Sequence, residues 1–184
     1  MQQSNSHGVA TFLLMTIITA SAALTGCAKD KVPPNDARRA DLLGIREDTL
    51  TQLYRARETA RPEVEQAPGY AVFSNEQAPG AVDGGAEGYG VVINNTTTLP
   101  TYMKMEQTAP AGGKPVELKE YRFVIVFPDA ATMQTFAQTG WKFGPAGSTA
   151  TAGKPLKIYR LTHDGVEVTN TVPSTRFWPY KELN

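Results

Sequence analysis

The sequence has one cysteine, two histidines and no charged side chain before Lys29. One cysteine excludes an intramolecular disulfide framework and a multi-cysteine metal cluster. The 18 Lys and Arg residues balance the 18 Asp and Glu residues, which argues against a nucleic-acid-binding protein. No activated-serine motif and no calcium-binding loop of the EF-hand type occurs. We therefore expect neither enzyme activity nor a cofactor.

Histidine offers little for catalysis. His163 stands beside Asp164 in a predicted hairpin turn, where neighbouring side chains point apart. The pair is therefore interpreted as part of a turn and not as a catalytic dyad.

The charge-free N-terminal segment contains an apolar run from Val9 to Leu24, which is 16 residues long. A membrane-spanning helix needs about 20 apolar residues, whereas a signal-peptide core is shorter. The run ends in Leu-Thr-Gly-Cys27, which resembles the lipobox of bacterial lipoproteins. We expect residues 1–26 to be a signal peptide and Cys27 to carry acyl chains such as palmitate. The alternative is an uncleaved signal anchor with an incidental cysteine.

The lipobox resemblance also implies a location. Residues 27–34 would form a lipidated tether that is too polar and proline-rich to pack, and the folded domain would cover residues 35–184. Ala28 follows the cysteine, and in Gram-negative lipoproteins a residue other than Asp there usually permits export to the outer membrane. We therefore expect a protein of the cell envelope, anchored in the membrane through Cys27 and facing the periplasm.

A helix is predicted from Asn35 or Asp36, either of which can act as its N-cap, to the break at Pro62. Apolar residues recur at helical spacing along it: Leu42, Leu43, Ile45, Leu50, Leu53 and Tyr54. The favoured interpretation is an amphipathic helix that covers a sheet. In the alternative, the helix lies on anionic headgroups through Arg38, Arg39 and Arg46.

The rest of the chain indicates strands separated by glycine and proline. Strands are predicted around residues 69–73, 91–93, 102–106, 117–127, 156–161, 166–168 and 175–180. A short helix begins at Pro128 and Asp129 and ends at Gly140, with Met133, Phe136 and Ala137 facing inward. The predicted fold is therefore one α+β domain. It has a curved, mostly antiparallel, barrel-like sheet, the N-terminal helix and a short helix before the last strands.

Five glycines lie between residues 80 and 90. A phosphate-binding loop is not predicted, because neither of the usual glycine spacings occurs and a β-branched run follows in place of a helix. Glycine within a strand more often marks a bulge, strong curvature or a close approach of two backbones.

The order of these elements resembles the SYLF-domain family of lipid-binding proteins over nearly all of the expected mature chain. Three pieces are the most specific: the segment 62–73 ending in Gly-Tyr-Ala-Val-Phe, the Gly-Trp-Lys-Phe-Gly box at 140–144, and the ending Lys-Glu-Leu-Asn at 181–184. Bacterial members of this family are often lipoproteins. The resemblance implies a domain that binds phospholipid.

Lipid binding requires cations for phosphate and aromatic side chains for the interface. Residues 101–184 hold ten Lys and Arg against seven acids. The candidate lipid contacts are Trp141, Lys142, Lys157 and Arg160, with Trp178 and Tyr180 as further interfacial aromatics. We expect anionic phospholipid headgroups as partners. The alternative is a non-catalytic structural module that holds an envelope protein partner on the same scaffold.

Overall fold

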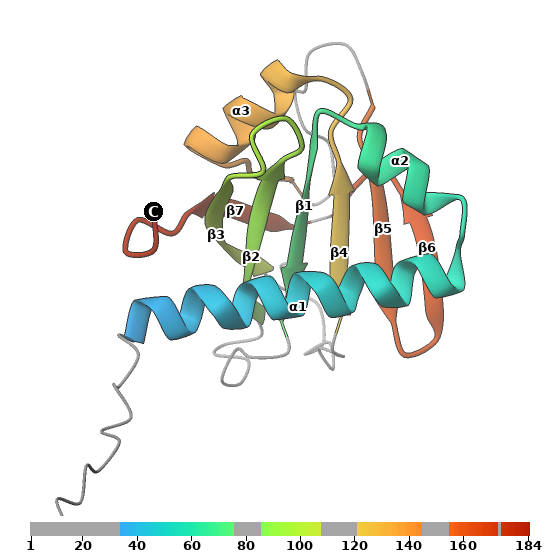
Figure 1. Cartoon of the computed structure of the whole chain (residues 1–184), viewed down its shortest axis with the longest axis horizontal. Coiled ribbons are helices and arrows are strands. Elements are labelled where there is room, and N and C mark those ends of the chain that lie inside the picture. Colours follow the sequence, from blue (N-terminus) through green and yellow to red (C-terminus); the bar gives the residue numbers. More distant parts are fainter. Residues whose placement is uncertain (1–33, 76–85, 108–120, 145–154, 173) are drawn as a thin grey trace, which may run out of the picture. The chain divides into compact units, whose positions relative to one another are not determined.

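The computed structural model describes residues 34–75, 86–107, 121–144, 155–172 and 174–184, all within one compact unit, residues 32–184. Its elements follow in this order: α1 (Pro34–Ala56), α2 (Ala60–Gln66), β1 (Gly69–Ser74), β2 (Ala86–Asn94), β3 (Pro100–Gln107), β4 (Tyr121–Val126), α3 (Ala130–Thr139), β5 (Lys157–Thr162), β6 (Gly165–Thr169) and β7 (Thr175–Pro179) (Figure 1). The strands form one antiparallel sheet in the order β6-β5-β4-β1-β2-β3-β7, which does not close. The predicted α+β class is confirmed.

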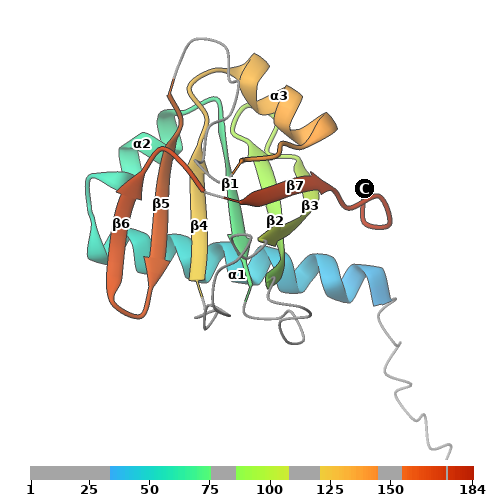
Figure 2. The same ribbon diagram turned by 180° about the vertical axis from the view of Figure 1, so that it is seen from behind.

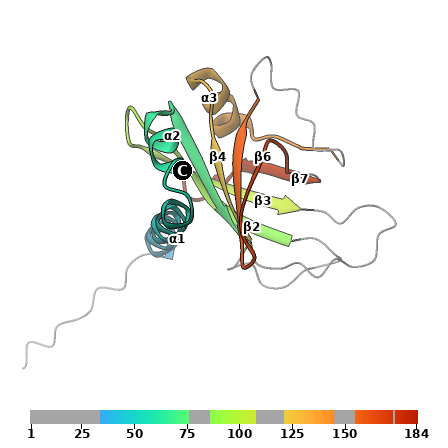
Figure 3. The ribbon, with the colours of Figure 1, turned by 90° about the vertical axis from the view of Figure 1, so that its right-hand side faces the viewer.

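The sheet lies between two layers. Helices α1 and α2 cover one face, and α3 lies on the opposite face together with β7 (Figures 1 and 2). The sheet curves strongly beyond β3, so that β7 runs across the other strands on the α3 side (Figures 2 and 3). This curvature agrees with the barrel-like expectation, although the two ends of the sheet stay apart.

The two faces of the sheet carry different aromatic residues. The core on the α3 face holds the phenylalanines of the described residues: Phe73, Phe123, Phe127, Phe136, Phe143 and Phe177. The core under α1 and α2 holds six of the seven tyrosines, some of them only partly buried: Tyr54, Tyr70, Tyr89, Tyr102, Tyr159 and Tyr180. A phenol ring needs a partner for its hydroxyl group, whereas a phenyl ring does not. The core on the α3 face is therefore the less polar of the two, with Tyr121 as the one tyrosine among its buried residues.

The N-terminal helical region differs from its prediction. The predicted single helix ending at Pro62 is two helices, with a break over residues 57–59. Pro62 does not stop a helix but is the third residue of α2, where its missing N–H costs nothing because the first N–H groups of a helix lack partners. At the other end α1 begins at Pro34, so Asp36 lies in its first turn and is not its N-cap.

The face of α1 that packs on the sheet is also more polar than predicted. Its fully buried residues are Leu42, Thr49 and Leu53, while the other apolar residues of the predicted stripe are only partly buried. The Thr49 hydroxyl donates to the carbonyl of Ile45 at 2.6 Å, which satisfies its donor inside the interface. As the favoured interpretation stated, α1 covers the sheet.

The predicted strands and the second helix are found close to their expected positions, although β2 begins five residues before the predicted 91–93 strand. Residues 117–120 of the predicted 117–127 strand lie outside the described residues. Residues 123–127, predicted to be buried on both sides, are all buried. Asp129 is the N-cap of α3 and accepts a hydrogen bond from the backbone N–H of Thr132 at 2.8 Å. A Cβ on Gly90 would lie 2.2 Å from the carbonyl oxygen of Val72, so this glycine marks a close backbone approach, one of the three roles expected for a glycine within a strand.

The Gly-Trp-Lys-Phe-Gly box covers the outer edge of β7. The backbone N–H of Phe177 donates to the carbonyl of Trp141 at 2.7 Å, and that of Phe143 donates to the carbonyl of Thr175 at 2.8 Å. Gly140 makes this pairing possible, because its φ is 68° and an added Cβ would lie 1.9 Å from the Phe177 carbonyl oxygen. Within the described residues, β6 is then the one strand with an open edge.

The Lys-Glu-Leu-Asn segment joins the sheet to α1. Leu183 is buried in the core under α1, and the Asn184 side chain forms two hydrogen bonds with the backbone of Tyr102, at 2.8 and 2.9 Å. From α1, Arg39 donates to the carbonyl of Leu183 at 2.9 Å, and Asn35 donates to that of Glu182 at 3.0 Å. This segment therefore has a structural role in holding the start of α1 on the sheet.

Candidate functional site

The predicted contacts in the 140–144 box divide into core and surface residues. The Trp141 ring packs against the phenylalanine core, with its centroid 4.8 Å from that of Phe136. Lys142 points the other way and is exposed. Trp141 therefore supports the fold, whereas Lys142 is accessible to a ligand.

Lys157 and Arg160 do not form one site. Side chains alternate along β5, so Lys157 shares the α2 face with Tyr159, and Arg160 lies on the opposite face near Tyr121. Arg160 Nη1 lies 3.8 Å from Glu167 Oε2. The structure thus separates the candidate cations predicted to flank Tyr159, because strand neighbours point to opposite faces.

Lys157 belongs to a small polar cluster between α2 and β5. Its Nζ lies 2.5 Å from Glu63 Oε2, and the Tyr159 hydroxyl donates to the same carboxylate. Burial alone would raise the pKa of Glu63, but the hydrogen bonds from Lys157 and Tyr159 outweigh it and hold this pKa below its ordinary value of 4.5. The hydrogen bond to Glu63 raises the pKa of Lys157. This cluster fastens α2 to the sheet.

Glu63→Gln should remove a pH-dependent contribution to the free energy of unfolding. Because the folded-state pKa of Glu63 is lowered, its carboxylate stabilises the fold above pH 4.5, and this contribution is lost as the pH falls through the folded-state value. Urea denaturation should therefore give the parent a larger free energy of unfolding than Glu63→Gln at neutral pH. This difference should shrink as the pH is lowered. A difference between the two proteins that stays constant with pH would contradict the Glu63 assignment.

A second group of side chains lies where the start of α1 meets β2, β3 and β7. We define the aromatic–cation surface by six residues from these elements and the segment after β7: Arg38, Tyr89, Lys104, Arg176, Trp178 and Tyr180. The cross-strand register places Tyr89, Lys104 and Trp178 in one row. All six side chains are exposed or partly exposed.

Each cation of the aromatic–cation surface lies against a ring. The Arg38 guanidinium is 4.3 Å from the Tyr89 ring centroid, and Lys104 Nζ is 4.1 Å from that of Tyr180. The Arg176 guanidinium is 5.1 Å from the Trp178 ring. Such pairs contribute about 0.5–1 kcal/mol at exposed sites. The arrangement holds cationic and aromatic groups together at the surface, where they can bind an anion beside an apolar group.

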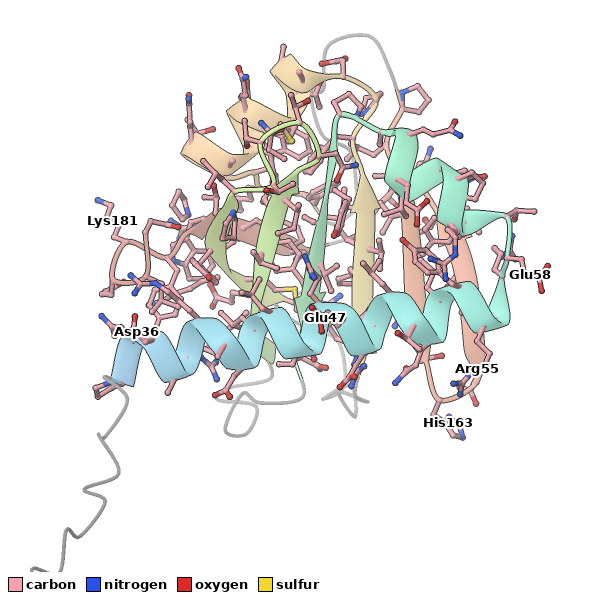
Figure 4. All side chains as sticks on the ribbon, viewed as in Figure 1. Asp36, Glu47, Arg55, Glu58, His163 and Lys181 are labelled. Atoms are coloured by element: carbon pink, nitrogen blue, oxygen red, sulfur yellow. The ribbon has the colours of Figure 1, made fainter. Side chains whose placement is uncertain are left out.

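The outer face of α1 has the opposite character. It exposes four acids and one arginine within the helix: Asp36, Asp41, Glu47, Asp48 and Arg55. Figure 4 marks three of these positions along the helix. Of the three arginines proposed for membrane contact in the alternative, Arg39 binds the Leu183 carbonyl and Arg46 pairs with Glu47 at 3.0 Å. The third, Arg38, lies against Tyr89 in the aromatic–cation surface. The geometry therefore disfavours the outer face of α1 as the surface for anionic headgroups.

Metal ligands are not clustered in the described part of the chain, where no group of three or more His, Cys, Asp or Glu side chains comes together. None of the three helices described above has the length and apolar character needed to span a lipid bilayer. The predicted lipidation site, Cys27, lies outside the described residues. The expectation that the side chains of His163 and Asp164 point apart is wrong, since His163 Nδ1 lies 2.9 Å from Asp164 Oδ1. Both side chains are exposed in the turn between β5 and β6.

Half of the aromatic–cation surface was missed from the sequence, which singled out Trp178 and Tyr180 and, in the alternative interpretation, Arg38. Its members come from four separate segments, so no local motif marks them. Their signal lies in alternation, since Lys104 and Arg176 occupy outward positions on strands whose neighbouring residues are buried.

Comparison with known proteins gives one distant relative and no family assignment. No model of a known protein family matches the chain. The chain is 28% identical over 162 residues to Beta cell expansion factor A from Aeromonas veronii. The match covers 82% of this chain and 61% of that relative, so the chain spans about three fifths of the length of the protein it matches. This similarity supports a distant family link.

Proposed function

We propose that this chain is an envelope lipoprotein whose SYLF-like domain binds phospholipid at the membrane surface through the aromatic–cation surface. The observation that carries the proposal is the set of three cation–ring pairs at one end of the sheet. Tyr and Trp favour the headgroup region of a bilayer, and Lys and Arg bind its phosphates. The resemblance to SYLF-domain proteins and the distant similarity to Beta cell expansion factor A extend over most of the chain and support a shared scaffold.

The tether adds a geometric argument. Seven residue steps separate Cys27 from Pro34, where α1 begins. A fully extended chain spans at most about 3.6 Å per residue, so a lipid on Cys27 would keep the start of α1 within about 25 Å of the bilayer. Arg38 lies in this first part of α1 and belongs to the aromatic–cation surface. The anchor would therefore hold this surface near the membrane.

The charge distribution favours the same orientation. The acids on the outer face of α1 are repelled by an anionic leaflet, whereas cations near its surface are attracted by about 1 kcal/mol each. The aromatic–cation surface would then face the lipid, and the acidic outer face of α1 would point away from the bilayer.

Cys27→Ser should abolish lipidation, because only a thiol accepts the diacylglyceryl group. In cells supplied with a radioactive fatty acid, the parent should be labelled and should fractionate with the membrane. The variant should carry no label. Equal labelling of both proteins would remove the lipoprotein part of the proposal.

The domain without its anchor should bind anionic vesicles. We expect residues 28–184 to float with phosphatidylglycerol vesicles, and less so as salt is added, because exposed charges are screened over about 8 Å at physiological ionic strength. Replacing Arg38 and Lys104 together with Gln should weaken this binding by about 2 kcal/mol, roughly thirtyfold.

The control for this experiment is the pair Lys157→Gln and Arg160→Gln, which removes the same charge from two other places in the sheet. Its binding should match that of the parent. If only the control pair lost vesicle binding, the lipid-binding site would lie on β5 and not at the aromatic–cation surface. A folded domain that floats with no vesicle would contradict lipid binding and favour a protein-interaction module in the envelope.

A further inference from the structure

Two positive side chains lie next to each other across the outermost pairing of the sheet. Lys142 and Arg176 form an antiparallel bridge, and both are exposed. The backbone hydrogen bonds run between the residues on either side of them, from Phe143 to Thr175 and from Phe177 to Trp141. They are therefore a non-hydrogen-bonded pair, whose Cα atoms approach to about 4.5 Å and whose side chains leave the same face.

Like charges directly opposite each other on a sheet are destabilising. No carboxylate of the described residues forms an ion pair with Lys142 or Arg176. Glu106 is the other cross-strand neighbour of Arg176 and lies on the side away from Lys142. The space between the two cations thus has positive charge from both sides, and an anion there would relieve their repulsion.

We propose that Lys142 and Arg176 form a binding site for a phosphate group, with Trp178 as its aromatic wall. Arg binds phosphate through two parallel hydrogen bonds, while Lys provides a point charge. A phosphate monoester carries about −1.5 to −2 charges at neutral pH, which matches two cations better than a carboxylate does. The Arg176 guanidinium already rests 5.1 Å from the Trp178 ring, which limits its freedom.

The phosphate can belong to a lipid headgroup or to a soluble phosphate. The lipid source rests on the proposed function, whereas binding of free phosphate does not. The experiment therefore uses both probes on the full chain, held in nanodiscs of neutral phosphatidylcholine.

Inorganic phosphate should change the fluorescence of Trp178, while chloride at equal ionic strength should not. The chain has two tryptophans, so loss of the signal in Trp178→Phe assigns it. Lys142→Gln and Arg176→Gln should each weaken phosphate binding about tenfold, or about 1.4 kcal/mol. Lys142→Arg should retain most of the affinity, whereas Arg176→Lys should lose part of it, because an ammonium group cannot form the two parallel hydrogen bonds of a guanidinium. Glu106→Gln should tighten phosphate binding.

The matched control is Arg55→Gln, which removes a charge from the last turn of α1. It should bind phosphate like the parent, and all variants should melt near the parent temperature because the altered side chains are exposed or partly exposed. Phosphate binding that is absent in the parent, or unchanged in the two Gln variants, would overturn the site.

Lipid enters in a second arm, with phosphatidic acid added to the nanodiscs. A fluorescence change that is lost in the two Gln variants supports the site with lipid phosphate as its ligand. A response to inorganic phosphate alone supports a soluble ligand and contradicts the lipid source. Vesicle flotation that persists in both Gln variants, with no phosphate response in the parent, would overturn this site and leave the proposed function standing.

Discussion

Replacing Phe136 with alanine is expected to lower the free energy of unfolding by about 3–5 kcal/mol, because it leaves a cavity in a close-packed core. The Phe136 side chain is fully buried. Its ring centroid lies 4.8–6.1 Å from those of four other rings: Phe73, Phe127, Trp141 and Phe177. The Phe136 ring therefore joins α3, the sheet and the 140–144 box. Urea denaturation of the parent and of Phe136→Ala measures the loss in free energy of unfolding.

Gln134→Ala is the control for this experiment, since it changes an exposed residue of the same helix. It should stay within about 0.5 kcal/mol of the parent. A Phe136→Ala protein that is equally stable would mean that α3 does not pack on the sheet as described.

Gly140→Ala should also destabilise the protein strongly. With φ 68° and ψ −177°, Gly140 lies in a backbone region that is essentially restricted to glycine, and adopting it costs a residue with a side chain about 1–3 kcal/mol. The new Cβ would in addition lie 1.9 Å from the backbone oxygen of Phe177, and backbone cannot move aside as a flexible side chain can. We expect a total loss above about 2 kcal/mol and weakened pairing of the box with β7, which hydrogen exchange at Phe143 and Phe177 would detect.

The same substitution at Gly44 provides a matched control. This glycine is exposed in the middle of α1, and an added Cβ would meet nothing within 4 Å. Gly44→Ala should therefore stabilise the protein by up to about 1 kcal/mol, since Ala favours the helical conformation. If Gly140→Ala and Gly44→Ala were destabilised equally, the conclusion that the backbone at residue 140 requires glycine would be wrong.

Most of the fold could be predicted because its signals are local. Alternation, buried apolar runs and turn residues mark the strands, and Asp129 with Gly140 marks both ends of α3. The break between α1 and α2 could not be predicted in the same way. Residues 57–59 have no glycine or proline to mark the break. Pro62 suggests the end of a helix, whereas in the structure it lies in the first turn of α2.

The candidate site was less predictable, for two different reasons. The separation of Lys157 from Arg160 follows from the period of two along a strand, so it can be derived once that strand is assigned. The meeting of Arg38, Tyr89 and Lys104 cannot, because it depends on strand order and on where α1 crosses the sheet. The SYLF resemblance likewise indicated the Gly-Trp-Lys-Phe-Gly box without indicating that its tryptophan is structural.

The covered edge of β7 limits how copies of this protein could assemble by adding strands. An open edge is a template for another chain, and a sheet with two open edges can extend in both directions to form a fibre. In the described residues the 140–144 box occupies one end of the sheet, and β6 alone is open. Two copies that pair through their β6 strands would therefore leave neither copy with an open edge. Polymerisation by this route would stop at the dimer.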